Sequence, residues 1–169
     1  AATLDYASPE AVRRVAVTFG GVKHRLQLVK ELRGVRYYNS SIDSSPTRTA
    51  AAISAVNRPM RIICGGYDKK IPFEPLAKAL AENPLIKTVV LTGATMEKIK
   101  AALSAEPEFT ARNDVQVICE SDFEKAVRAA SLSAVPGDAV LLSPACASFD
   151  TFENFEKRGE AFCQIVETL

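Results

Sequence analysis

Short runs of Val, Ile and Leu recur along the chain with helical stretches between them, and this alternation constrains the fold more than any other feature. The apolar runs are Met60 to Cys64, Thr88 to Thr92, Val115 to Cys119 and Ala139 to Leu142, and the intervening helical stretches are Phe73 to Glu82, Ala94 to Leu103 and Phe123 to Ser133. Strands this apolar are typical of parallel sheets covered by helices on both faces. The sequence therefore predicts an α/β fold with a doubly wound, mostly parallel, Rossmann-like sheet.

A helix and a hairpin are expected before this alternation. Ser8-Pro9-Glu10 predicts a helix start with Pro9 in the first helical position, and Gly20-Gly21 predicts the stop. Two β-rich runs, Arg25 to Leu32 and Val35 to Tyr38, flank Arg33-Gly34 as in a hairpin.

The remaining stretches complete the expected element order. Thr47 to Val56 reads as a helix, Ser104 to Asp114 as a surface loop, and the last helix is expected from about Ser148 toward Leu169.

Composition excludes several classes of function. The chain has 169 residues, a size suited to a single domain, and its formal net charge of +1 offers no field to attract nucleic acid or an anionic membrane surface. No apolar run approaches the roughly 20 residues that cross a bilayer, and the first residues do not resemble a signal peptide. The four cysteines form no CxxC pair, which argues against a zinc site and favours reduced thiols in a cytosolic protein.

Ligands of such sheets collect beyond the carboxyl ends of the strands, so those tails are the places to look for a site. Gly65-Gly66 precede two lysines and let the backbone approach a ligand, although Gly-Gly after a strand is more often only a turn. Ser148, expected at a helix start, could hold a carboxylate with the neighbouring N–H groups, or could simply cap its helix.

Three further side chains invite a chemical role. Arg25 could clamp a phosphate, although a surface arginine is the commoner outcome, and its neighbour His24 has no partner that would make it a catalytic base. Cys146 also lacks a partner base, so an inert buried thiol is expected. No residue is therefore assigned a catalytic role, and no metal site is expected in this chain.

Four ordered motifs together resemble one family. The run LLSPACASFDTFENFEKRGEAF (141–162) is similar to the C-terminal signature of the MurD branch of the Mur ligases, which adds D-glutamate. FGGVKHRL (19–26), YNSSIDSSPTRTAAAI (38–53) and GGYDKKIPF (65–73) support it in the same order. The resemblance covers nearly the whole chain.

The resemblance implies a cytoplasmic, ATP- and Mg-dependent ligase of peptidoglycan precursor synthesis that joins D-glutamate to UDP-N-acetylmuramoyl-L-alanine. Residues 1–18 would then be the tail of the central ATPase domain, and 19–169 the C-terminal amino-acid-binding domain. ATP and Mg would be bound mainly outside this chain, so the isolated domain is not expected to turn over. The start at Ala1 rather than Met fits a fragment.

The same resemblance assigns residues to two ligands. Lys69, Ser44, Ser148 and the backbone around Phe155 would hold D-glutamate. Arg25, with His24 beside it as a lesser candidate, would reach the ATP phosphates, and Ser40 occupies a position that faces the nucleotide.

Departures from the family pattern keep alternatives open. Ser40 stands where the family often has aspartate, Ile42 where it has lysine, and Gln27 where glutamate is common; Asp43 could compensate for the missing aspartate. The alternatives are another Mur ligase, a folylpolyglutamate synthase, or a binding module that kept the fold and lost the site.

Overall fold

The structure is a computed structural model that describes residues 7–18 and 21–169. Phe19 and Gly20 lie outside the described residues. The first begins the motif FGGVKHRL (19–26), and the second begins the predicted helix stop Gly20-Gly21. The helices are α1 (Pro9–Thr18), α2 (Pro46–Ala55), α3 (Glu74–Glu82), α4 (Met96–Ala105), α5 (Pro107–Thr110), α6 (Phe123–Leu132) and α7 (Phe155–Glu167). The strands are β1 (Gln27–Leu32), β2 (Val35–Asn39), β3 (Met60–Gly65), β4 (Ile86–Thr92), β5 (Gln116–Cys119) and β6 (Ala139–Leu142).

One sheet of six strands, in the order β1-β2-β6-β3-β4-β5, forms the centre of the molecule. β1 and β2 are the predicted antiparallel hairpin, and every other neighbouring pair is parallel. β6 comes last in the chain yet lies between β2 and β3, where Leu142 is paired with both Asn39 and Ile63. The loops that leave these three strands therefore start side by side.

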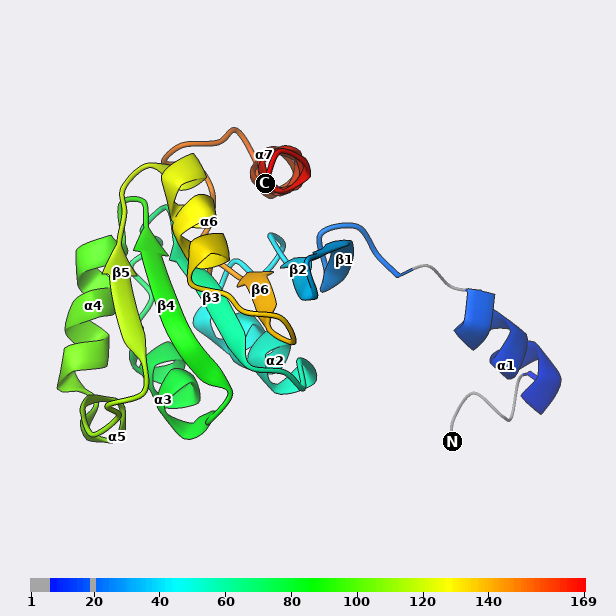
Figure 1. The fold of residues 1–169 in the computed structure, drawn as a ribbon, viewed down its shortest axis with the longest axis horizontal. Coiled ribbons are helices and arrows are strands. Elements are labelled where there is room, and N and C mark those ends of the chain that lie inside the picture. The colour runs from blue at the N-terminus through cyan, green and yellow to red at the C-terminus, as the bar shows by residue number, and fades with distance from the viewer. Residues whose placement is uncertain (1–6, 19–20) are drawn as a thin grey trace.

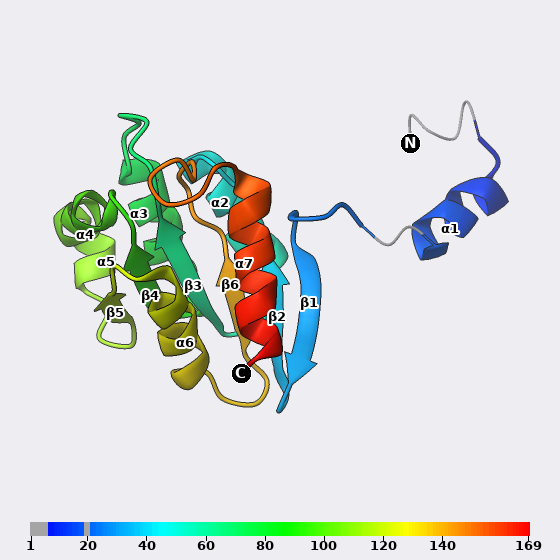
Figure 2. The same ribbon diagram turned by 90° about the horizontal axis from the view of Figure 1, so that it is seen from above.

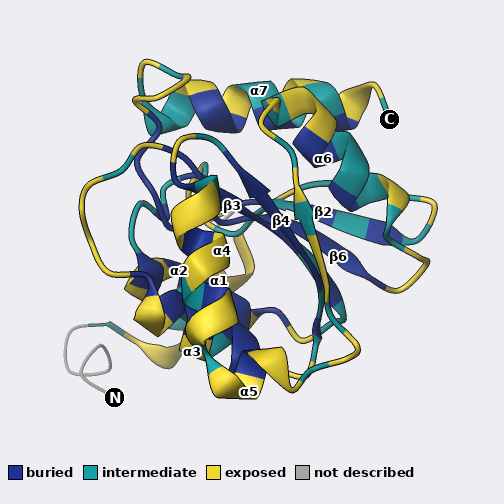
Figure 3. Ribbon diagram, turned by 90° about the vertical axis from the view of Figure 1, so that its left-hand side faces the viewer, coloured by how far each residue is buried: buried dark blue, intermediate teal, exposed yellow. Residues whose placement is uncertain are grey.

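Helices cover both faces of the sheet, as Figure 1 and the view from above in Figure 2 show. One face packs against α2, α3 and α4 through a cluster that includes Ile53, Leu76 and Ile99. The other packs against α6 and α7 through Val127 and Phe162. Figure 3 shows the buried strands between these two layers. The predicted doubly wound α/β fold is confirmed.

The N-terminal helix α1 stands apart from the sheet in both ribbon views, and none of its residues is buried. Its apolar side chains Val15 and Val17 are 60% and 78% exposed. The sheet and its two helical layers are thus complete without α1.

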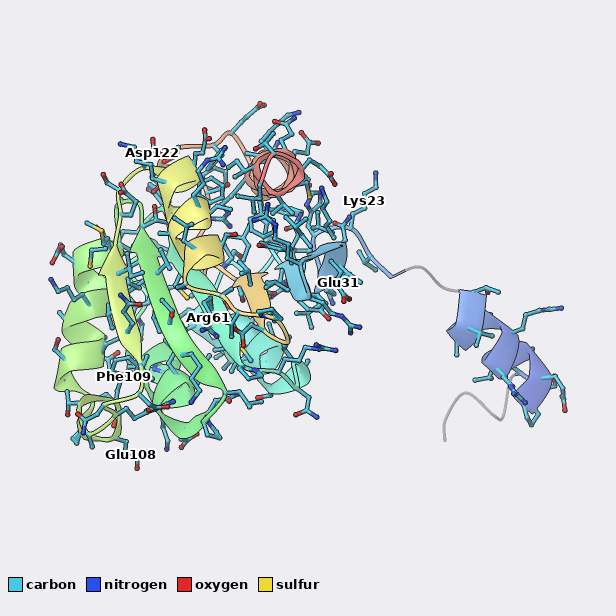
Figure 4. All side chains as sticks on the ribbon, viewed as in Figure 1. Lys23, Glu31, Arg61, Glu108, Phe109 and Asp122 are labelled. Atoms are coloured by element: carbon cyan, nitrogen blue, oxygen red, sulfur yellow. The ribbon has the colours of Figure 1, made fainter. Side chains whose placement is uncertain are left out.

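Two element predictions were wrong in part. The segment expected to be a plain loop contains α5, which forms because Pro107 starts it, the Glu106 side chain accepts a hydrogen bond from the Glu108 backbone N–H, and Phe109 is buried. Figure 4 places Glu108 and Phe109 at the end of the sheet opposite Asp122. β5 exists as predicted but is mostly exposed, because it is an edge strand.

The last helix begins at Phe155, seven residues later than predicted. Asn154 caps it by accepting a hydrogen bond from the backbone N–H of Lys157 at 2.8 Å. Ahead of it, the carbonyl of Ser148 accepts from Thr151 and Phe152 and closes a turn. Ser148 therefore caps no helix, and the predicted cradle of helix N-terminal N–H groups at this residue is wrong.

Candidate functional site

Three loops meet at the carboxyl end of the sheet, following β2, β3 and β6. The ammonium of Lys69, in the loop after β3, donates to the hydroxyl of Ser44, in the loop after β2, at 3.4 Å. Tyr67, also after β3, donates its backbone N–H to the carbonyl of Ala147 in the third loop at 2.9 Å. The structure thus brings Lys69 and Ser44 into contact and ties their surroundings to the residue before Ser148.

Gly66 makes this close approach possible. Its φ of 146° lies in a region that side-chain-bearing residues rarely adopt, and a Cβ there would lie 2.3 Å from the carbonyl oxygen of Ala147. The Gly-Gly pair at the end of β3 is therefore more than a turn, because Gly66 lets the loops that follow β3 and β6 touch.

Ser148 is 2% exposed and directly follows Ala147, whose carbonyl accepts the hydrogen bond from Tyr67. Among the described residues, its hydroxyl has no hydrogen-bond partner, although its carbonyl closes the turn to Thr151 and Phe152. A nearly buried hydroxyl of this kind is available to a ligand. The residue predicted as a carboxylate contact is suited to that task by its side chain rather than by a helix end.

Phe155 and His24 lie together on the neighbouring side of the site. Their rings meet edge to face with centroids 5.9 Å apart, and both line a cavity of about 670 Å³. The Nδ1 of His24 is 3.1 Å from the side-chain nitrogen of Asn39, and the carbonyl of Phe155 accepts from Ser41 at 2.8 Å. His24 therefore anchors the segment that enters the domain.

Arg25 and Ser40 line a second cavity of about 410 Å³, together with Asp43 and Arg48. The hydroxyl of Ser40, itself buried, accepts a hydrogen bond from the backbone N–H of Leu26 at 3.1 Å. Ser40 consequently holds the backbone next to Arg25, whose exposed guanidinium faces this cavity.

Asp43 is a buried acid in the same cavity. Ser143 donates to its carboxylate at 2.8 Å, but burial outweighs this bond and raises the pKa of Asp43 above its usual value. Asp43 lies beside Ser40 and lines the same cavity as Arg25. This position is consistent with the prediction that the Asp43 carboxylate takes the place of the family aspartate that Ser40 replaces.

Arg158 is a component of the site that the sequence analysis did not identify. It lies in the first turns of α7, is 2% exposed, and donates hydrogen bonds to Ser41, Cys146 and Ala147. Within the charged run EKRGE it reads as a solvent-exposed helical arginine. Only the packing of α7 against the two loops reveals its role.

The cysteines are all free thiols. Cys146, 3.2 Å from the hydroxyl of Thr95, is buried, and burial raises its pKa to about 11. A thiol this reluctant to ionise is a poor nucleophile. This supports the interpretation of Cys146 as an inert packing residue.

A metal-binding cluster and a membrane-spanning helix are both absent from the part of the chain that the structure describes. Across 7–18 and 21–169, no three His, Cys, Asp or Glu side chains cluster as metal ligands would. None of the described helices has both the length and the apolar character needed to span a bilayer.

Residues 24–146 match the family model described as "Mur ligase, glutamate ligase domain". Among curated proteins, the chain is 48% identical over 168 residues to a UDP-N-acetylmuramoylalanine--D-glutamate ligase of Clostridium perfringens and 45% identical over 170 residues to that of Acetivibrio thermocellus. These alignments cover 99% and 100% of the chain, but it spans only 36% of each relative.

Solved structures share the fold at low sequence identity. A murein peptide ligase of Psychrobacter arcticus aligns with a TM-score of 0.58 and 16% identity over 96% of this chain and 34% of its own. A MurF ligase of Thermotoga maritima, in complex with ADP, aligns with a TM-score of 0.55 and 17% identity over 89% of this chain and 33% of its own.

Proposed function

Because the chain belongs to the Mur ligase glutamate ligase domain family, we propose that it is the C-terminal, amino-acid-binding domain of an ATP-dependent ligase that adds D-glutamate to UDP-N-acetylmuramoyl-L-alanine. Relatives 42–48% identical to the chain carry that name. The observation that carries the proposal is the contact of Lys69 with Ser44, together with the hydrogen bond that ties the loop of Lys69 to Ala147, the residue before Ser148.

D-Glutamate has two carboxylates and one amine, which suits this group of side chains. Lys69 would pair with one carboxylate, and the hydroxyls of Ser44 and Ser148 would donate to carboxylate oxygens. The amine would then be held toward the carboxyl group of the second substrate. That carboxyl group is activated by transfer of the ATP γ-phosphoryl group, attacked by the amine, and released from phosphate as the amide forms. The contribution of this chain is positioning and charge stabilisation.

The nucleotide side of the site belongs to the entering segment. Arg25 would reach the ATP phosphates with its exposed guanidinium, and Ser40 would act by holding the backbone at Leu26 rather than by touching ATP. His24 packs against Phe155, so it would orient this segment. ATP and Mg would be held mainly by the central domain that precedes this chain.

The exposed α1 supports the division of the chain into two parts. Residues 1–18 would end the central domain, which would cover the apolar side chains of α1, and 19–169 would form the C-terminal domain. Without the other domains the isolated chain would not turn over. The partners would be D-glutamate and, through the preceding domains, UDP-N-acetylmuramoyl-L-alanine, in the cytoplasm.

The test is phosphate release by the full-length protein with D-glutamate, L-lysine or meso-diaminopimelate as acceptor. Release with D-glutamate alone supports the proposal. Loss of a charged hydrogen bond should make Lys69→Ala about 10- to 100-fold lower in kcat/KM for D-glutamate. Lys78→Ala, which removes an exposed lysine of α3, serves as the control and should leave it unchanged.

A degenerate binding module remains the second candidate, and Ser40 and Ile42 are the residues that favour it. It predicts no turnover with any acceptor, and recovery of activity in a Ser40→Asp variant would trace the loss to that position. Turnover with another acceptor in place of D-glutamate would instead assign the chain to a different amide ligase.

A further inference from the structure

Arg158 is a buried cation that forms no direct ion pair with a carboxylate in the part of the chain that the structure describes. Among the described residues its guanidinium hydrogen-bonds only to uncharged groups: the hydroxyl and carbonyl of Ser41, at 3.0 and 2.9 Å, and the carbonyls of Cys146 and Ala147, at 3.0 and 2.9 Å. Burial lowers its pKa to about 10. The carboxylates of Asp150 and Asp43 attract it, but neither accepts a hydrogen bond from it. Burying a cation without a direct ion pair is unfavourable by several kcal/mol before hydrogen bonds are counted, so a purely structural role would be better filled by an apolar side chain.

The four hydrogen bonds of Arg158 join two ligand-facing loops. Ser41 precedes Ser44 by three residues in the loop after β2, and Ala147 directly precedes Ser148 in the loop after β6. The same carbonyl of Ala147 also accepts from the loop that carries Lys69. The guanidinium therefore lies at the junction of all three loops.

The planar guanidinium suits this junction. It carries five N–H donors that lie in one plane and point in different directions. Of its four observed hydrogen bonds, two go to Ser41 in the loop after β2, and the other two go to Cys146 and Ala147 in the loop after β6. A lysine ammonium at the end of a similar stem is a single point and cannot span both loops.

We infer that Arg158 is a positioning residue for the amino-acid substrate, fixing the separation between Ser44 and Ser148 so that both reach the same ligand. The inference rests on the proposed function. Arg158 does not itself contact the substrate, and the nucleotide-side residues Arg25 and Ser40 lie outside its hydrogen bonds. Its loss should therefore weaken D-glutamate binding more than ATP binding.

The experiment uses the full-length protein and its Arg158→Lys and Arg158→Ala variants. The control is Arg112→Lys, because Arg112 also donates to several carbonyls, those of Leu80, Asn83 and Ile86, but at the opposite end of the sheet. For each protein one would measure the KM for D-glutamate, the KM for ATP, kcat and the melting temperature.

Arg158→Lys should raise the KM for D-glutamate about tenfold or more, the effect of losing one or two hydrogen bonds to a charged group, while the KM for ATP changes less than about twofold. Arg112→Lys should lower the melting temperature and leave both KM values unchanged. Added methylguanidinium should lower the D-glutamate KM of Arg158→Ala by occupying the vacated space, and ammonium should not.

Each contrary result overturns the inference. A parental D-glutamate KM in Arg158→Lys would show that the loops hold their spacing without the guanidinium. Equal increases in the two KM values, or an increase of the D-glutamate KM in Arg112→Lys, would reduce Arg158 to a stability residue. Failure of the parent protein itself to use D-glutamate would instead refute the proposed function, and the inference with it.

Discussion

Replacing Gly66 with alanine should separate two loops that the site needs in contact. At its φ of 146° an alanine is strained by about 1–3 kcal/mol. The new Cβ would lie 2.3 Å from the carbonyl oxygen of Ala147, about 1 Å closer than a carbon and an oxygen atom tolerate. Moving that carbonyl breaks its hydrogen bond with Tyr67, worth about 0.5–1.5 kcal/mol. Gly66→Ala should therefore lower the free energy of unfolding by about 2–4 kcal/mol.

The matched control is Gly137→Ala. Gly137 also has a positive φ, 101°, but no atom lies within 4 Å of a Cβ built there, so only the backbone strain of about 1–2 kcal/mol applies. Urea unfolding followed by circular dichroism measures both variants, and with a slope of about 2 kcal/mol/M the Gly66→Ala midpoint should fall by about 1–2 M. Full-length Gly66→Ala should also bind D-glutamate less tightly. Equal losses of stability in the two variants would refute the argument that close contact, rather than backbone strain, explains Gly66.

Three other predictions concern single side chains. Burial raises the pKa of Asp43, so its ionised form weakens the fold: the contribution is favourable at low pH and is lost as pH rises through the folded-state pKa. Asp43→Asn should melt higher than the parent at pH 7, with the gap closing as the pH falls; a gap independent of pH would contradict this. Iodoacetamide at pH 8 should label exposed Cys119 in the native protein but reach Cys146, with its pKa of about 11, only after unfolding, as peptide mass mapping would show. Arg61→Met removes the ion pair of 2.6 Å with Asp138 and should lower the free energy of unfolding, measured in urea, by about 3–5 kcal/mol. It should leave the D-glutamate KM unchanged, because Arg61 lies away from the carboxyl end of the sheet (Figure 4). A changed KM would show coupling across the sheet.

The sequence was sufficient for the centre of the sheet because β3, β4 and β6 each contain a short run of apolar residues. Ile62 and Val89 are fully buried, as the pattern of buried parallel strands predicts. The start of α7 was mispredicted because serine is a residue type that often caps helices, so Ser148 was taken as the start, whereas Asn154 is the residue that caps α7. Local composition could not separate these candidates, since the turn after β6 depends on packing with distant loops.

The candidate site was predictable where a resemblance supplied it and unpredictable where tertiary contacts create it. Lys69 and Ser44, which lie 25 residues apart in the sequence, were named from two different motifs, and they are in contact. Arg158 acquires its significance from burial, which the identity of one residue in a sequence does not reveal. Asp43 was named from the sequence, but the rise of its pKa likewise depends on its burial in the folded chain. Whether the named residues hold the proposed ligands stays a prediction that the variants above can test.

The position of β6 has a consequence for the way the molecule is made. A growing chain leaves the ribosome with its hairpin and its β3-β4-β5 unit unable to join, because residues 139–142 fill the gap between β2 and β3. Until residues 139–142 have been synthesised and inserted, the edges of β2 and β3 that face this gap stay unpaired. Unpaired strand edges favour association with other chains. Assembly of the sheet must wait for the same segment that leads directly into the loop of Ser148. A newly synthesised molecule that has closed its sheet has therefore, by the same event, brought the last ligand-facing loop to its place.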